Sequence, residues 1–151
     1  MKTGVLVGDA MTCQPVTLTP DTSVSECSKV MADKHVGSII VAENERLLGI
    51  VTEQDIVRKA VASGLRAADT PLKAVMSPKL LTISPDKDVF DALKFMGDKN
   101  LRHLPVVDKK GKLVGYITGK DILKLQPQLF EILADKIELR EQERKINYQQ
   151  L

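Results

Sequence analysis

The chain contains one pattern of residues twice, at 11–57 and at 76–123. A displacement of 65 positions aligns the first part of each copy. One extra residue near Gly111 makes the displacement 66, which brings Asp55 onto Asp121. Self-similarity at a fixed displacement is the signature of a repeated structural unit. The sequence therefore predicts a duplicated fold, in which each element of one copy has a counterpart in the other.

The spacing of apolar residues changes in the same order within each copy, and it predicts strand, helix, strand, strand and helix. In the first copy these elements span 16–18, 24–31, 38–42, 47–51 and 53–62. In the second copy they span 81–83, 89–96, 103–107, 113–117 and 119–125. A short polar turn between the third and fourth elements predicts a β-hairpin in each copy. A Ser-Gly pair at 63–64 predicts the end of the last helix of the first copy.

Two helical stripes of mostly apolar residues are predicted to lie in the core. They consist of Val24, Cys27, Ser28 and Met31 in the first copy and of Val89, Ala92, Leu93 and Met96 in the second. We interpret Met31 and Met96 as residues that fill gaps between other apolar side chains, rather than as cofactor ligands. Ser23 and Glu26 have the spacing of a capping box at the start of the first stripe.

Chain length limits the domain organisation. Each copy has about fifty residues, which is below the size at which a single core is reliably stable. We therefore expect the copies to pack face to face and form one module. The predicted organisation is a first repeat at 1–64, a linker at 65–75, a second repeat at 76–125 and a C-terminal helix at 126–151. That helix either caps the module or serves as a dimer arm or docking helix.

Composition and charge exclude several classes of protein. The 22 basic and 20 acidic residues give a net charge of +2, without the excess of positive charge that nucleic-acid-binding proteins usually carry. Cys13 and Cys27 do not form a CxxC pair, and with two histidines in total the sequence shows no ligand set for a structural zinc site. No apolar run reaches the roughly 18 residues needed to cross a membrane. We expect a cytoplasmic protein that binds neither nucleic acid nor a membrane.

A strand runs into a helix through the same motif, Gly-x-x-Thr-x-x-Asp, at 49–55 and at 115–121. The repeated order of elements, a Pro-Asp turn before the first helix of each copy, this paired motif and the segment Arg-His-Leu-Pro-Val-Val at 102–107 together resemble a tandem pair of cystathionine-β-synthase (CBS) domains. The resemblance covers residues from about 5 to about 125. It implies a mixed α/β (α+β) fold in which two βαββα repeats pack with pseudo-two-fold symmetry, followed by the C-terminal helix.

The resemblance also implies two sites for an adenosine-containing ligand, in clefts between the repeats. In such pairs the Asp of the motif accepts hydrogen bonds from the ribose hydroxyls, and the Thr lies near the ribose or phosphate; these positions are Thr52, Asp55, Thr118 and Asp121. Residues of the first and second strands complete the sites: Thr17, Ser38 and Ile39 in one copy and Thr82, Arg102, His103 and Pro105 in the other. An ionised carboxylate makes strong hydrogen bonds to hydroxyl groups. A Thr followed three residues later by an acid also caps a helix, so both interpretations stay open.

The copies differ at the start of the second strand. Arg102 and His103 stand in the second copy where the first has Gly37 and Ser38. Positive charge for a phosphate group is therefore predicted near the second copy, and the two sites are expected to be unequal. Arg58, just beyond the first motif, either reaches a phosphate or stays in solvent. His103 is either a hydrogen-bonded strand residue or a ligand contact.

Neither a catalytic site nor a metal site is predicted. The sequence shows no nucleophile paired with a base and no cluster of metal ligands, so we expect neither an enzyme nor a required cofactor. The predicted function is a regulatory module whose regulatory ligand is an adenine nucleotide (AMP, ADP or ATP) or S-adenosylmethionine. A homodimer would signal to an unidentified protein partner. The alternative is a structural module with vestigial sites that works by self-association. A nucleic-acid accessory factor is disfavoured by the balanced charge.

Overall fold

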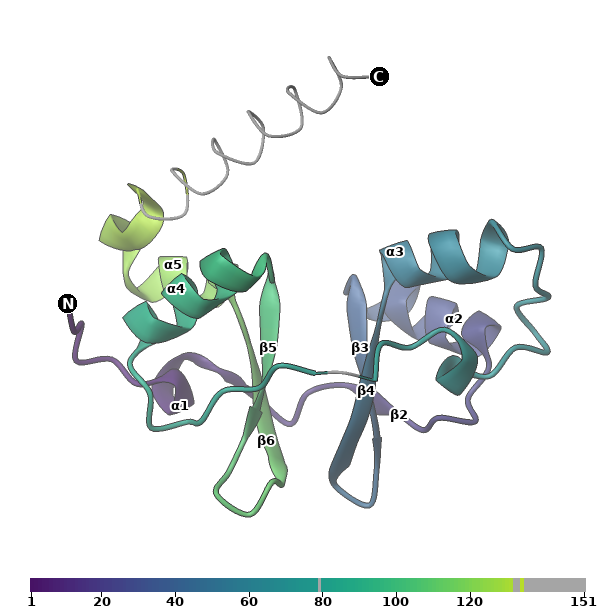
Figure 1. The fold of residues 1–151 in the computed structure, drawn as a ribbon, viewed down its shortest axis with the longest axis horizontal. Helices are drawn as coiled ribbons and strands as arrows, with labels where there is room; N and C mark the ends of the chain where they lie inside the picture. Colours follow the sequence, from purple (N-terminus) through teal and green to yellow (C-terminus); the bar gives the residue numbers. More distant parts are fainter. Residues whose placement is uncertain (79, 132–133, 135–151) are drawn as a thin grey trace. The chain divides into compact units, whose positions relative to one another are not determined.

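The computed structural model describes residues 1–78, 80–131 and 134. The helix predicted at 126–151 therefore lies largely outside the described residues. At its start the structure has a 3-10 helix, η3 (Pro127–Leu129). Figure 1 shows the described helices and strands in the order of the sequence.

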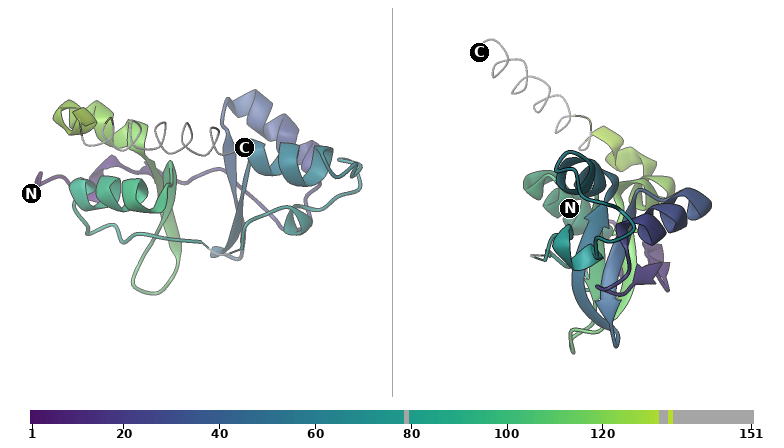
Figure 2. Two further views of the ribbon diagram at one scale, coloured as in Figure 1. Left: turned by 45° about the horizontal axis from the view of Figure 1, so that its top comes forward. Right: turned by 90° about the vertical axis from the view of Figure 1, so that its right-hand side faces the viewer.

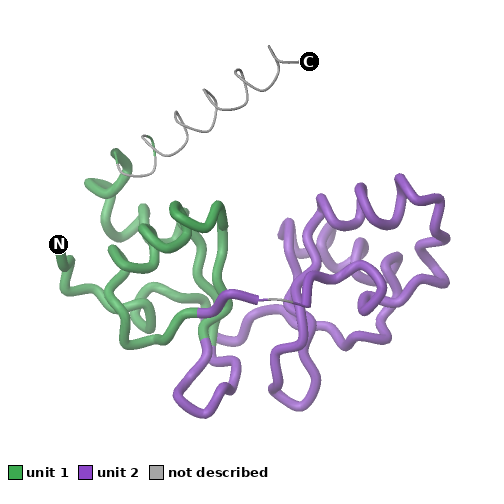
Figure 3. The backbone as a smooth tube through the Cα atoms, in the orientation of Figure 1, with its two compact units in different colours: residues 1–12, 83–106, 115–151 green, residues 13–82, 107–114 purple. Residues whose placement is uncertain are grey.

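The chain divides into two compact units (Figure 3). Unit 1 contains residues 1–12 and 83–106 together with the described residues from 115 onward. Unit 2 contains residues 13–82 and 107–114. Neither unit is continuous in sequence, because each combines most of one copy of the repeat with segments from elsewhere in the chain.

A three-stranded sheet forms one layer of unit 2. It has the order β2-β3-β4, and its strands are β2 (Thr17–Leu18), β3 (Ser38–Glu43) and β4 (Arg46–Thr52). β2 runs parallel to β3, and β3 pairs antiparallel with β4. Asn44 and Glu45 between them have φ angles of 53° and 64°, the left-handed conformation of a two-residue type I′ turn. The hairpin predicted for the first copy is confirmed.

The last helix of the first copy is one α-helical turn followed by a π-helix, namely α3 (Glu53–Asp55) and η1 (Ile56–Val61). The backbone N–H of Ala62 donates to the carbonyl of Val57 at 2.9 Å, five residues earlier, which is the π-helical spacing. The helix predicted at 53–62 is present, but its second part has π-helical rather than α-helical hydrogen bonding. Gly64 has a φ of 70°, in agreement with the predicted helix end.

The first long helix of each copy is built in the same way. These helices are α2 (Val24–Lys34) and α4 (Val89–Lys99), each of 11 residues. Each ends at a left-handed residue, His35 in α2 and Asn100 in α4. The Ser23 hydroxyl accepts a hydrogen bond from a first-turn N–H at 3.1 Å, which satisfies one of the free donors at the helix start. Local caps therefore set the same length for both helices.

The core of unit 2 lies on one side of its sheet, where α2 and the α3–η1 helix cover the strands (Figure 2). Its buried members are Val24, Cys27, Met31, Ile39, Val41, Val51, Ala60, Leu72 and Val75. The predicted stripes of α2 and α4 are confirmed as buried, except that Ser28 is half-buried. Burial raises the pKa of the Cys27 thiol to about 11, so this cysteine is a core residue rather than a reactive thiolate.

The second sheet has the order β1-β6-β5. Its strands are β1 (Thr12–Cys13), β5 (His103–Val107) and β6 (Leu113–Thr118). A short helix, α1 (Val7–Ala10), precedes β1, and α5 (Gly119–Leu125) follows β6. The predicted bounds of α5 are confirmed. Across the described part of the chain, no helix combines the length and apolar character that crossing a bilayer requires.

The strand predicted at 81–83 is wrong in the second copy. Only Ile83 pairs there, through one parallel bridge to Val106. Its N–H donates to the carbonyl of Pro105 at 3.1 Å. Leu81 is 44% exposed, so the apolar side chain that suggested a strand has no core to enter.

The segment before the first copy packs against the second copy. The N–H of Val7 donates to the carbonyl of Lys87 at 2.8 Å, and that of Gly8 donates to the carbonyl of Pro85 at 2.9 Å. The Val7 side chain is fully buried. Residues 1–12 therefore belong to the unit that contains the second copy.

Asp88 fixes this N-terminal segment to the start of α4. Its carboxylate accepts hydrogen bonds from the N–H of Phe90 (2.8 Å), from the N–H and hydroxyl of Thr3 (both 2.9 Å) and from the N–H of Gly4 (3.0 Å). One buried carboxylate thus caps a helix and binds a segment that is distant in sequence.

The segment before the second copy packs against the first copy. It contains a 3-10 helix, η2 (Leu72–Ala74), followed by Val75. Leu72 and Val75 are fully buried, and the Leu72 N–H donates to the carbonyl of Thr22 at 2.9 Å. Residues 65–75, predicted as a linker, therefore contribute two side chains to the core of unit 2.

Residues 1–12 and 65–77 are called the exchanged segments below, because each packs against the copy other than the one that it leads into. They explain the glycine of the Gly-x-x-Thr-x-x-Asp motif. A Cβ on Gly49 would lie 2.6 Å from the sulfur of Met76 and 3.1 Å from the carbonyl oxygen of Ser77. Gly115 faces Met11 in the same way. The glycines are thus required by the close approach of the exchanged segment, whose methionine covers them.

Candidate functional site

The Thr-x-x-Asp turn has the same geometry in both copies. Asp55 Oδ2 accepts hydrogen bonds from the Thr52 N–H (2.9 Å) and hydroxyl (3.0 Å), and the Asp55 N–H donates to Thr52 Oγ1 at 3.2 Å. The corresponding distances between Thr118 and Asp121 are 3.0, 2.9 and 3.2 Å. Both turns are complete capping boxes. The helix-capping interpretation of the motif is therefore confirmed in both copies, and any ligand role is additional to it.

The second oxygen of each carboxylate distinguishes the copies. Asp55 Oδ1 lies 2.9 Å from the ammonium nitrogen of Lys59, and the Asp55 side chain is 14% exposed. Among the described residues, Asp121 Oδ1 has no hydrogen-bond or ion-pair partner. The position equivalent to Lys59 is Leu125, which has no charge. The second copy therefore presents a carboxylate oxygen that can accept hydrogen bonds, whereas the corresponding oxygen of Asp55 is already paired with Lys59.

Charge near the motif also differs between the copies. A carboxylate oxygen of Glu53, the first residue of α3, lies 3.2 Å from where a Cβ on Gly37 would be. In the second copy Gly119 replaces this acid, and its N–H donates to the carbonyl of Arg102 at 3.3 Å. The Arg102 side chain is exposed. An acid thus stands beside the first motif, and a cation stands beside the second.

His103 stacks on Tyr116 across the second hairpin. The ring centroids are 5.6 Å apart with an interplanar angle of 24°. His103 is half-buried at the start of β5. The stack holds the imidazole of His103, which follows Arg102 in the chain, at the same end of the hairpin as the second motif. Both interpretations of His103, as a strand residue and as a ligand contact, fit this position.

Two of the predicted ligand residues have buried side chains. Ile39 lies in the core of unit 2 with 1% exposure, so the ligand contact predicted for it would have to come from its backbone. Pro105 is also buried, and its carbonyl is bonded to Ile83. Each lies in a run of three consecutive buried residues, 39–41 in β3 and 104–106 in β5, so these strands are buried on both faces.

The other predicted positions are accessible to differing degrees. Thr17 is exposed on β2, Thr82 is half-buried, and Ser38 is half-buried at the start of β3, where it pairs with Thr52. Arg58 is exposed on η1. Ser38, Thr52 and Asp55 thus lie at one end of the β3–β4 hairpin.

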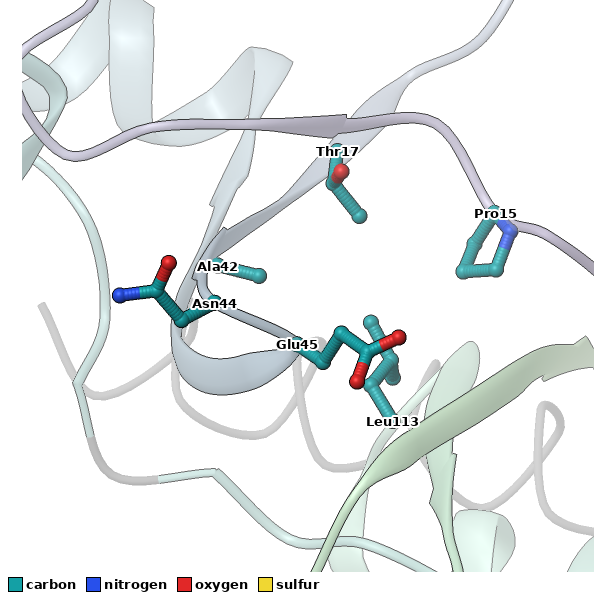
Figure 4. Close-up of a pocket in the computed structure, with 6 residues that line it drawn as sticks. All are labelled: Pro15, Thr17, Ala42, Asn44, Glu45 and Leu113. Atoms are coloured by element: carbon teal, nitrogen blue, oxygen red, sulfur yellow. The ribbon is translucent and has the colours of Figure 1, made fainter.

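A small pocket lies at the other end of that hairpin (Figure 4). It has a volume of about 240 Å³ and is lined by Pro15, Thr17, Ala42, Asn44, Glu45 and Leu113. In Figure 4 the Asn44 amide points away from the other labelled side chains. The volume is below the roughly 300–1,000 Å³ of typical ligand pockets. Of the predicted ligand residues that the structure describes, Thr17 alone lines it, so this pocket is not the predicted site.

Lys59 is the functional candidate that the sequence prediction missed. Its ammonium contacts Asp55, the carbonyl of Val75 (3.1 Å) and the hydroxyl of Ser77 (3.4 Å). The signal was present, because an acid and a lysine four residues apart on a helix commonly pair. The contacts with residues 75 and 77 could not be read from spacing. Among the described residues, no group of three or more His, Cys, Asp and Glu side chains could hold a metal ion.

The model of the CBS domain family matches two segments of the chain, residues 7–62 and 72–127. The chain belongs to the CBS domain family. An uncharacterized protein of Methanopyrus kandleri is 32% identical to this CBS pair over 140 residues, which are 92% of this chain and 71% of that protein. The family and the mixed α/β repeat fold predicted from the sequence are thereby confirmed.

Two proteins with similar solved structures were determined in complex with adenosine-based ligands. The structure of CBSX2 in complex with AMP has 26% identity and a TM-score of 0.72, covering 83% of this chain and 98% of that one. The CBS domain pair of MJ0100, in complex with 5′-methylthioadenosine and S-adenosyl-L-methionine, has 26% identity and a TM-score of 0.71. That match covers 80% of this chain and 94% of the other.

Proposed function

We propose that this CBS pair is a non-enzymatic regulatory module that binds an adenosine-containing ligand at the second repeat. The observation that carries the proposal is the Asp121 carboxylate. One of its oxygens is engaged by Thr118, and the other has no partner among the described residues. The two hydroxyl groups of a ribose diol can each donate a hydrogen bond. Charge-assisted hydrogen bonds to a carboxylate are among the stronger hydrogen bonds in proteins.

The surroundings of Asp121 suit the remainder of a nucleotide. Arg102 is exposed immediately before β5 and supplies a cation for a phosphate group, since guanidinium groups bind phosphate through two parallel N–H bonds. AMP, ADP, ATP and S-adenosylmethionine share the adenosine part. The ligands named for the two similar structures also contain it, which supports adenosine as the common determinant.

The experiment is titration calorimetry of the full chain with AMP, ADP, ATP, S-adenosylmethionine and 2′-deoxy-AMP. We expect binding of at least one ribonucleotide and weaker binding of the deoxy compound, which lacks one hydroxyl of the diol. Asp121→Asn should reduce that affinity at least tenfold, while it keeps an acceptor for Thr118. Asp55→Asn is the matched control and should change the affinity less than twofold. Absence of binding to every compound would exclude this function.

The proposed output of the module is a signal to a protein partner through a cytoplasmic homodimer. Light scattering coupled to size-exclusion chromatography tests the dimer with and without AMP. A monomer in both conditions would contradict it.

A structural module that works by self-association is the second candidate. Val57 and Val61, four residues apart on the α3–η1 helix, are 58% and 67% exposed, which favours a contact with another molecule. This candidate predicts self-association that is independent of nucleotide. Retention of the dimer together with absence of nucleotide binding would select it over the regulatory module.

A further inference from the structure

The ammonium group of Lys59 is held by three acceptors. They are Asp55 Oδ1 at 2.9 Å, the carbonyl of Val75 at 3.1 Å and Ser77 Oγ at 3.4 Å. An ammonium group has three N–H donors, so each donor has an acceptor. Val75 is fully buried, which fixes its carbonyl beside the helix. Lys59 is therefore more firmly placed than an ordinary ion pair on a helix surface, where the two side chains hold each other alone.

Lone pairs can be counted on the two motif carboxylates. Each oxygen can accept about two hydrogen bonds. Oδ2 of Asp55 receives two from Thr52, and Oδ1 receives one from Lys59. One acceptor position remains, and a vicinal diol needs two. Asp121 receives only the two bonds from Thr118 among the described residues, so both positions on Oδ1 remain for a diol.

Charge acts in the same direction as this count. Lys59 neutralises the Asp55 carboxylate, and a diol would have to replace a charge-assisted bond with a bond to a neutral hydroxyl. The displaced ammonium would also leave its contacts with Val75 and Ser77. In the second repeat the equivalent residue is Leu125, which is 50% exposed and carries no donor.

We propose that Lys59 closes the first repeat to ligands with a vicinal diol, so that each chain binds one nucleotide, at the second repeat. This inference rests on the proposed function for its ligand. It assigns to Lys59 a role in specificity, and it assigns the difference in diol binding between the repeats to one pair of equivalent positions, Lys59 and Leu125.

The test is a reciprocal exchange of these two residues. Titration calorimetry with AMP should give one site per wild-type chain and two sites in Lys59→Leu. In Leu125→Lys the new lysine lies four residues after Asp121, and the affinity should fall at least tenfold. Lys29→Leu removes an exposed lysine from α2 and is the control for net charge; it should leave one site with unchanged affinity. Circular dichroism verifies the fold of each variant, and Lys59→Met, which keeps the aliphatic chain, replaces Lys59→Leu if that variant does not fold.

Each outcome decides the inference. Two sites in the wild type, or one unchanged site in Lys59→Leu and Lys59→Met, would overturn it. Unchanged affinity in Leu125→Lys would overturn it as well. If the wild type binds no nucleotide, the proposed function fails at the second repeat. The inference then stands only if a site appears in Lys59→Leu, and it falls if none appears.

Discussion

Asp55 and Asp121 cap equivalent helices with almost identical hydrogen bonds, yet a lysine engages the first carboxylate and a leucine follows the second at that position. Glu53 stands beside the first motif, whereas Arg102 stands beside the second. The comparison separates two contributions to each site. Hydrogen bonds between the Thr and Asp of the motif fix the backbone in both repeats, and we propose that other side chains determine what each repeat can bind. Five predictions test these two contributions, from the largest expected effect to the smallest.

The largest effect is expected where the exchanged segments enter the cores. Leu72→Ala should lower the free energy of unfolding by about 2–5 kcal/mol, because a fully buried leucine leaves a cavity. Val7→Ala, at the equivalent position, removes less volume and should cost about 2 kcal/mol. Urea denaturation followed by circular dichroism measures both. Val57→Ala, at a 58% exposed position, is the control and should stay within about 0.5 kcal/mol. An effect of Leu72→Ala as small as the control would contradict this packing.

The second-largest effect is expected at the N-terminal caps of α2 and α4, whose contributions to the free energy of unfolding should differ. Asp88→Ala removes the acceptor of four hydrogen bonds and should cost about 3 kcal/mol, since bonds to a charged group are the stronger ones. Ser23→Ala, at the equivalent position in α2, removes one bond and should cost about 1 kcal/mol. Similar losses for both variants would show that Asp88 does not bind the N-terminal segment in solution.

Asp88 also predicts a pH dependence. Burial acts to raise its pKa, but hydrogen bonds from Phe90, Thr3 and Gly4 outweigh burial and lower the pKa below the ordinary 3.8. The stabilisation is therefore complete above the unfolded-state pKa, near 4, and is lost as the pH falls through the lower pKa of the folded state. Asp88→Asn should flatten the acid side of the stability profile, whereas Ser23→Ala should leave its slope unchanged.

The charge difference between the repeats should appear in ligand affinity. Arg102→Gly introduces the residue found at the equivalent position of the first repeat. It should weaken AMP binding about tenfold, or about 1.4 kcal/mol, and change adenosine binding little, because only AMP has a phosphate. Lys109→Gly removes another exposed cation and serves as the control. Equal losses for AMP and adenosine would place Arg102 away from the phosphate.

The smallest difference is expected between the capping threonines. Thr52→Ala and Thr118→Ala should each cost about 1 kcal/mol, and the two costs should agree because the hydrogen bonds match. Thermal denaturation of both variants measures them. Costs that differ by more than about 1 kcal/mol would show that the two turns are not energetically equivalent.

Local signals in the sequence predicted the elements that local chemistry determines. The hairpin of the first copy, the buried stripes of α2 and α4 and the bounds of α5 follow from periodicity, turn residues and caps. The π-helix of η1 was missed because the residues at 56–61 have the same pattern as an α-helix. The strand at 81–83 was wrong because an apolar residue there, Leu81, has no core to enter.

The candidate site was predictable as far as the repeat motif reached. Comparison of the copies gave Thr52, Asp55 and their equivalents, and it gave the unequal charge at Arg102. The burial of Ile39 required knowledge that β3 is buried on both faces. Prediction of the contacts of Lys59 would have required the position of Val75, which lies 16 residues away in the chain. The spacing of residue types alone does not reveal contacts at that range.

The exchanged segments make the two repeats interdependent. A chain divided between residues 65 and 71 would give two fragments. Each fragment would carry the exchanged segment that the other needs, so neither would be a complete folding unit. A protein with a single copy would have to donate its exchanged segment to a second molecule and accept the equivalent segment in return. Joining two copies in one polypeptide converts that reciprocal exchange into an intramolecular one, which no longer depends on protein concentration.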